Sequence, residues 1–153
     1  MAEAQRLTLD ALHRELGARM VDFAGFAMPL QYDGIMAEHT QARARAALFD
    51  VSHMGQVLLR ADAPEDAARA LEALVPQDVL GLRDGRQRYG FFTNDAGGIE
   101  DDLMIARRGE VLFLVVNAAR RAADEALLRA GLEPAGVTVE TLADRALLAL
   151  QGP

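Results

Sequence analysis

The chain of 153 residues contains no cysteine, no tryptophan and no lysine, so all 16 of its basic residues are arginine. The lack of cysteine excludes disulfides, thiolate metal ligands and cysteine nucleophiles. Only three histidines are present, His13, His39 and His53, and no two of them have the spacing of a metal-binding pair. We therefore expect no metal in the chemistry of this protein.

Positive charge and long apolar runs are also scarce. The formal net charge is -7 and the isoelectric point is near 4.9, which argues against a nucleic-acid partner. No apolar run is long enough to cross a bilayer. Residues 1–5 carry an early acid and no apolar segment of the kind that secretory or transit signals need. Together these absences predict a soluble, cytoplasmic protein with no membrane partner.

The residues that are present predict a globular α+β fold. Hydrophobic residues make up 51% of the chain and charged residues 25%, which is typical of a globular domain. Apolar spacing predicts helices over 7–16, 34–47, 63–74 and 118–130, with Asp62 as an N-cap and Gly131 as a stop. Strands are predicted over 20–23, with a break at Gly25 and Pro29, and over 56–59, 88–93, 103–106, 111–116, 137–141 and 146–151. Hairpin signals such as the turn at Gly109 favour antiparallel sheets with flanking helices.

Two adjacent carboxylates, Asp101 and Asp102, stand between the glycine turn Gly97-Gly98 and an apolar run that begins at Leu103. Because successive strand residues point to opposite faces, only one of the two acids can face a given site. Alternation alone does not choose between them. The alternative is an ordinary acidic turn. The double glycine is not a dinucleotide loop, because a third glycine is missing and a strand follows instead of a helix.

Several stretches of the chain, in order, resemble the aminomethyltransferase (T-protein) family of the glycine cleavage system. They are residues 16–32, residues 48–55 (LFDVSHMG), the GGIEDDL stretch at 97–103, residues 115–119 (VVNAA) and residues 147–153 (LLALQGP). They extend over nearly the whole chain. The chain is thus similar to the N-terminal portion of such a protein.

The resemblance implies the folate-binding T-protein fold. Residues 1–52 and 143–153 would be parts of a discontinuous first domain, and residues 53–142 a second, ferredoxin-like domain. The third domain of the family would be absent. Because much of the family's folate pocket comes from later residues, we expect this chain alone to be inactive.

The resemblance also implies a reaction and its participants. The family moves an aminomethyl group from the lipoyl arm of the H-protein to tetrahydrofolate, a co-substrate, with release of ammonia in glycine cleavage. The reacting carbon is iminium-like, so a nearby carboxylate can orient the amine, accept its proton and stabilise positive charge. The family gives this catalytic role to the second acid of the pair, which is Asp102 here.

Folate contacts carry over to Met54, Tyr89, Val115 and Asn117. A thioether adapts to a flat ring, and an amide matches the donor and acceptor edge of a pterin. By default Met54 and Val115 would instead be core residues, and Asn117 would cap the helix predicted from Ala118.

Other functions remain open at this point. The nearest is a folate-binding domain of a sarcosine or dimethylglycine oxidoreductase, although no flavin signature is present. A noncatalytic folate-binding module and an inert structural module are further alternatives. A hydrolase pair of Ser52 and His53 is disfavoured, since adjacent residues rarely face each other.

Overall fold

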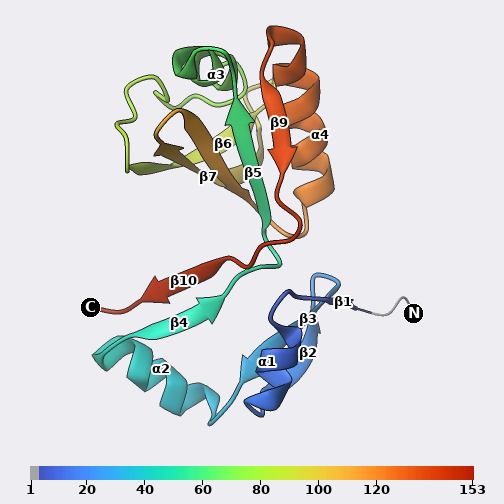
Figure 1. The fold of residues 1–153 in the computed structure, drawn as a ribbon, viewed down its shortest axis with the longest axis vertical. Coiled ribbons are helices and arrows are strands. Elements are labelled where there is room, and N and C mark those ends of the chain that lie inside the picture. The colour runs from blue at the N-terminus through green and yellow to red at the C-terminus, as the bar shows by residue number, and fades with distance from the viewer. Residues whose placement is uncertain (1–3) are drawn as a thin grey trace. The chain divides into compact units, whose positions relative to one another are not determined.

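The computed structural model describes residues 4–153, which form two compact units (Figure 1). Unit 1 comprises residues 4–53 and 144–153, and unit 2 comprises Met54–Ala143. Residues 1–3 lie outside the described residues. They belong to the first predicted domain and to residues 1–5, where no secretory or transit signal is expected.

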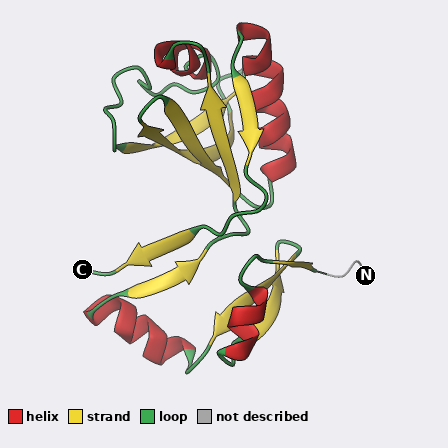
Figure 2. Cartoon of the chain, viewed as in Figure 1, coloured by secondary structure: helices red, strands yellow, loops and turns green. Residues whose placement is uncertain are grey.

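Unit 1 contains two small sheets and two helices. Figure 2 colours its helices red and its strands yellow. One sheet has the order β1-β3-β2, and the other pairs β10 with β4. The antiparallel pairs β2–β3 and β4–β10 are accompanied by one short parallel pair, β1–β3. Its elements are β1 (Gln5–Arg6), α1 (Asp10–Glu15), β2 (Arg19–Phe23), β3 (Phe26–Gln31), α2 (Ile35–Ala44), β4 (Ala47–Asp50) and β10 (Leu148–Gln151).

The expected break at Pro29 was wrong, because β3 continues through this residue. Pro29 lies opposite Met20, directly beside the register shift between Arg19 and Met20. The other neighbour of β3 pairs only with Phe26 and Ala27, so that edge of β3 is free at Pro29. A proline, which has no N–H to donate, is tolerated at such a bulge or edge.

Unit 2 is one antiparallel sheet with two helices. Its strand order is β6-β7-β8-β5-β9. The chain order β5-α3-β7-β8-α4-β9 is the βαββαβ arrangement of ferredoxin-like folds, and β6 adds an edge strand beside β7. Its elements are β5 (Gly55–Arg60), α3 (Pro64–Leu71), β6 (Gln87–Thr93), β7 (Ile99–Arg108), β8 (Val111–Val116), α4 (Arg121–Leu132), the 3₁₀ turn η1 (Glu133–Ala135) and β9 (Thr138–Thr141).

Helices α3 and α4 cover one face of this sheet and bury its core. Alternate residues of β7 and β8 are fully buried among the apolar side chains of the two helices. The core includes Val57, Leu59, Leu71, Phe92, Leu103, Ile105, Leu112, Leu114, Val116, Leu128 and Leu132. The opposite set of side chains on β7 and β8 is half-buried. The α+β class with antiparallel sheets is thus confirmed.

Three details of unit 2 differ from the expectations. Helix α3 starts at Pro64 after Ala63, with no side-chain cap, so the expected Asp62 N-cap is wrong. A proline in the first turn has no N–H that needs capping. Helix α4 starts at Arg121, and it runs through Gly131. This glycine marks a close approach instead of a stop, because a Cβ there would lie 2.9 Å from Leu74 Cδ2.

Candidate functional site

The two adjacent acids, Asp101 and Asp102, are the third and fourth residues of strand β7, and they do not lie in a turn. Asp101 pairs with Phe92 of β6, a fully buried core residue, so Asp101 points to the helix-covered face. Asp102 pairs with Phe91 and points to the opposite, open face of the sheet. The sheet therefore assigns the two carboxylates to different environments.

The open face around Asp102 is an apolar, half-exposed surface. Tyr89, Met104 and Val115 lie side by side in one transverse row across β6, β7 and β8. Phe91 lies two residues from Tyr89 on β6, and the two rings meet edge to face with centroids 5.2 Å apart. Of the predicted site residues, Tyr89, Val115 and Asp102 thus share one face of one sheet.

Asn117 follows β8 directly and joins the two acids. Its Nδ2 donates to Asp102 Oδ1 at 3.0 Å and to Asp101 Oδ1 at 3.1 Å, with a third contact to the Asp102 carbonyl at 3.3 Å. The side chain therefore does not cap α4, whose N-cap position is Arg120 and carries no side-chain cap. Since an amide has two N–H hydrogens, both are engaged by this acidic pair.

Tyr89 is the second polar group beside Asp102. A hydrogen bond with Asp102, burial and the charges of Asp102 and Asp101 together raise the pKa of the Tyr89 phenol. The ring is 52% exposed, so the phenol also reaches solvent. A phenol with a raised pKa keeps its proton and donates it in a hydrogen bond to the carboxylate. Asp102 thus has two donors, Tyr89 and Asn117, at the edge of the apolar surface.

Met54 is half-buried and lies in the bend that precedes β5. Gly55 pairs with Val116, so extending this register by one residue brings Met54 opposite Asn117. Val116 pairs with Leu103, so the next residue, Asn117, lies opposite Asp102 in the same row as Met54. The predicted folate contacts thereby fall into two adjacent rows at one end of the sheet.

Sequence reasoning missed three residues near this site. Phe91 and Met104 complete the apolar surface. Met104 could have been found from the β7–β8 register at the Gly109 hairpin, and Phe91 from strand alternation, because it lies two residues after Tyr89. Asp124 of α4 is 1% exposed and faces Asp101 from the helix side. An acid in the first turn of a helix normally stays in solvent, so nothing in the sequence signals its burial.

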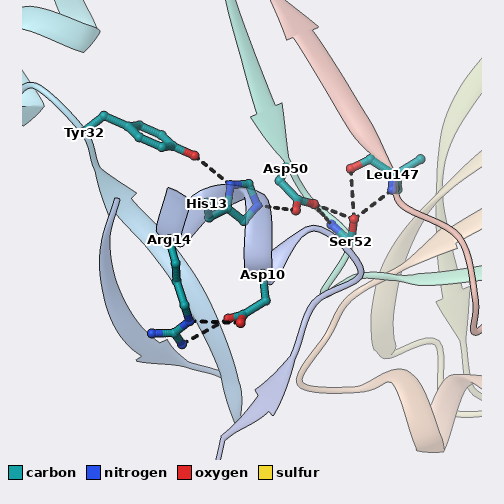
Figure 3. A network of polar contacts seen from close by, with 7 residues as sticks. All are labelled: Asp10, His13, Arg14, Tyr32, Asp50, Ser52 and Leu147. Carbon is teal, nitrogen blue, oxygen red and sulfur yellow. Dashed lines mark hydrogen bonds and ion pairs between the residues drawn. The ribbon is translucent and has the colours of Figure 1, made fainter. Parts of the chain in front are cut away.

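Ser52 and His53 belong to different networks of unit 1. The Ser52 hydroxyl donates to Asp50 and accepts the Leu147 N–H at 2.9 Å, two contacts drawn as dashed lines in Figure 3. Asp50 also contacts His13, which lies 2.7 Å from the hydroxyl of Tyr32. His53 instead meets the edges of the Phe23 and Phe26 rings, and burial lowers its pKa. The two residues do not form a hydrolase pair.

Within residues 4–153, no helix is both long and apolar enough to span a membrane. No group of three or more histidine, aspartate or glutamate side chains in this same range has a metal-binding arrangement.

Comparison with known proteins gives consistent results. Residues 9–153 match the model of the GCVT N-terminal domain family. An aminomethyltransferase of Rubrobacter xylanophilus is 48% identical over 150 residues, which are 97% of this chain and 40% of the relative. An aminomethyltransferase of Thermus thermophilus is 46% identical over 143 residues, or 92% of this chain and 40% of the relative.

A solved structure agrees with the fold. The crystal structure of glycine cleavage system aminomethyltransferase T from Bartonella henselae superposes with a TM-score of 0.89 at 39% identity. The match covers 97% of this chain and 41% of that one, so this chain spans about two fifths of the length of its relatives. The match to the family model, the identities and the shared fold together show that this chain belongs to the GCVT N-terminal domain family and corresponds to the N-terminal portion of a glycine cleavage T-protein.

Proposed function

We propose that this chain is the acid-bearing portion of a tetrahydrofolate-dependent aminomethyltransferase. The whole protein would move a one-carbon unit from the aminomethyl-lipoyl arm of the H-protein to tetrahydrofolate and release ammonia. The observation that carries the proposal is the position of Asp102. Its carboxylate lies on the open face of a rigid sheet, with Asn117 and Tyr89 as donors, beside an apolar surface.

Asp102 would serve as the acid–base and electrostatic group. Ionised, it can orient the transferred amine, accept its proton and stabilise the positive charge that develops on the reacting carbon. The contact of 3.0 Å with Asn117 Nδ2 engages one oxygen, Oδ1. The other oxygen, Oδ2, then has lone pairs available for the amine.

The apolar surface fits a flat aromatic ligand. Tyr89, Met104 and Val115 form a half-exposed row next to Asp102, and Phe91 extends it. Tetrahydrofolate supplies the nitrogen that accepts the one-carbon unit. We assign Met54, Tyr89 and Val115 to its ring contacts and Asn117 to its polar edge. By register Met54 lies at the end of the adjacent row, next to Asn117.

The division into two units supports a matching domain assignment. We assign residues 1–52 and 143–153 to the discontinuous first domain and residues 53–142 to the ferredoxin-like second domain. The unit boundaries at His53 and Ala143 fall within one residue of these limits. Because the chain spans about 40% of its relatives, we expect it to lack transferase activity by itself.

A chimera tests the proposal. In the Rubrobacter xylanophilus aminomethyltransferase, the matching 40% of the sequence is replaced by this chain, and aminomethyl transfer from lipoylated H-protein is measured. We expect the chimera to be active and Asp102→Asn to lower kcat by about 10²- to 10⁴-fold, the typical contribution of a positioned acid or base. Tetrahydrofolate affinity should change only a few-fold, since the amide keeps the shape of the carboxyl group.

Asp95→Asn is the matched control. It removes the same charge from the exposed turn that precedes β7 and should leave kcat unchanged. A folded, active chimera in which Asp102→Asn retains near-normal turnover would overturn the assignment of Asp102.

A further inference from the structure

A second pair of carboxyl groups lies behind Asp102, between the sheet and helix α4. Asp124, in the first turn of α4, is 1% exposed, and Asp101 points to the same helix-covered face from β7. The Oδ2 atoms of Asp124 and Asp101 are both buried and have no hydrogen-bond partner in the described chain. Two carboxyl groups on the same face, each with a buried and unpartnered oxygen, are the arrangement in which one proton is shared.

The surrounding charges favour the same arrangement. Burial, the Asp101 carboxyl group beside it and the charges of Asp101 and Asp102 raise the pKa of Asp124 to about 7, against an opposing effect of Arg120. Arg120 cannot neutralise the pair fully, since its guanidinium also lies 3.7 Å from Glu100. The other cation of this helix end, Arg121, donates to Glu125 at 2.9 Å. Phe92, the core residue that pairs with Asp101, is apolar and brings no charge.

Asn117 connects this pair to Asp102. One amide nitrogen donates both to Asp101 Oδ1, at 3.1 Å, and to Asp102 Oδ1, at 3.0 Å. Asp101 accepts this bond best with an oxygen that does not carry the proton. A proton placed between Asp101 Oδ2 and Asp124 Oδ2 leaves Asp101 Oδ1 free to hold the amide, and it lowers the negative charge behind Asp102.

We infer that Asp101 and Asp124 share one proton across the sheet–helix interface and act as positioning residues that hold Asn117, and through it Asp102, in place. Neither residue reaches the open face, so neither is a catalytic residue. Proton sharing stands independently of the proposed function, whereas the consequence for transfer rests on it. When the proton is lost, two adjacent buried charges face each other, and Asn117 and Asp102 shift in response.

The chain contains only two asparagines, Asn94 and Asn117, which makes a direct test possible. With ¹⁵N-asparagine labelling, the 153-residue chain gives just two side-chain amide groups in an NMR spectrum. On titration from about pH 5 to about pH 9, we expect the Asn117 amide to shift with a midpoint near neutral pH. Asn94, whose Nδ2 donates to Glu100 Oε1 at 2.6 Å, is the internal control and should show no such midpoint.

Labelling of aspartate ¹³Cγ should show one carboxyl group that titrates with the same midpoint. Asp124→Asn mimics the protonated partner and can still donate to Asp101, so in this variant both transitions should vanish while Asn117 keeps its low-pH position. An Asn117 amide that does not move over this range, or that moves equally in Asp124→Asn, would overturn the inference. If the variant does not fold, the wild-type titration alone still shows whether the Asn117 amide moves over this range.

The chimera then separates the two proposals. In the chimera with the unchanged chain, loss of the shared proton should lower kcat as pH rises above neutrality. Asp124→Asn should retain kcat at neutral pH and should not show this decline. Asp124→Leu should lower kcat more than it changes KM. If the NMR transitions appear but Asp102→Asn leaves turnover intact, the proposed function fails while the shared proton stands. If Asp102→Asn abolishes turnover and the transitions are absent, only the shared proton fails.

Discussion

His13 and Asp50 form a buried contact in unit 1, with 2.7 Å between His13 Nε2 and Asp50 Oδ2. They come from α1 and from the end of β4, so the contact joins elements that are far apart in the sequence. Asp50 also accepts from the backbone N–H and hydroxyl of Ser52, which in turn bonds to Leu147 beside β10. This network links three segments of unit 1.

Asp50→Asn should therefore destabilise unit 1. The substitution removes an acceptor from His13 or Ser52, and leaving a buried polar group unpaired costs about 1–3 kcal/mol. The free energy of unfolding from urea titration measures the effect. Asp33→Asn, which changes an exposed acid of the same unit, is the control and should stay within about 0.5 kcal/mol of the wild type. Equal stability of the two variants would contradict the network.

Stability should fall as pH rises from about 4 to about 7, because of Asp124. Its pKa is raised to about 7 in the folded chain, so the folded state holds a proton that the unfolded state has already released. The stabilisation is complete below the unfolded pKa near 3.8 and is lost as pH rises through about 7.

Asp124→Asn should remove this dependence. Relative to the wild type, its melting temperature should rise by at least about 2 °C between acidic and alkaline buffer, since about 1 kcal/mol corresponds to about 2–4 °C at this size. Calorimetry over this range measures it. A constant difference between wild type and variant at every pH would show that Asp124 does not titrate near neutrality.

At position 117, a negative charge should lower the free energy of unfolding more than loss of the amide side chain does. Asn117→Ala leaves Asp101 Oδ1 and Asp102 Oδ1 without their shared donor and should cost about 1–3 kcal/mol of unfolding free energy. Asn117→Asp places a third carboxylate at the same point and should cost more, with a larger penalty at high pH than at low pH. Denaturation of both variants at two pH values measures this. A smaller loss of unfolding free energy for Asn117→Asp than for Asn117→Ala would contradict the expected charge repulsion from Asp101 and Asp102.

Two glycine-to-alanine substitutions should have different effects. A Cβ at Gly55 would lie 2.5 Å from Cγ2 of Val116, a stiff, buried side chain, so Gly55→Ala should cost about 1–3 kcal/mol through overpacking. At Gly131 the nearest atom is the flexible tip of Leu74 at 2.9 Å. There the clash is offset by a gain of up to about 1 kcal/mol in helix propensity. Urea denaturation compares the two, and a larger loss for Gly131→Ala would contradict this account.

Much of the secondary structure was predictable because its pattern is local. Strand β8 is a short apolar run bounded by turn residues, and the hairpin at Gly109 gives the β7–β8 register almost directly. Together they predict that Val115 shares a face with every second residue of β7. The family resemblance then named Asp102, which alternation alone did not choose.

The remaining features depend on tertiary packing. Asp124 has the sequence position of a solvent-exposed acid at a helix start, and it is buried only because α4 packs on one face of the sheet. Asn117 is a plausible cap for a helix that starts at Ala118. In the structure α4 starts at Arg121, and the Asn117 amide donates to the carboxylates of Asp101 and Asp102 instead. Helix α2 buries none of its residues, so no apolar stripe limited its predicted length.

Because side chains alternate along β7, the length of the turn before it determines which of the two acids points to the open face. Deleting or inserting one residue between Asn94 and Glu100 could slide the strand by one position, which would turn every side chain of β7 over. Asp101 would then stand on the open face and Asp102 in the core, with composition almost unchanged. The register shift between Phe92 and Thr93, opposite this turn, is where such a change in length would have to be absorbed.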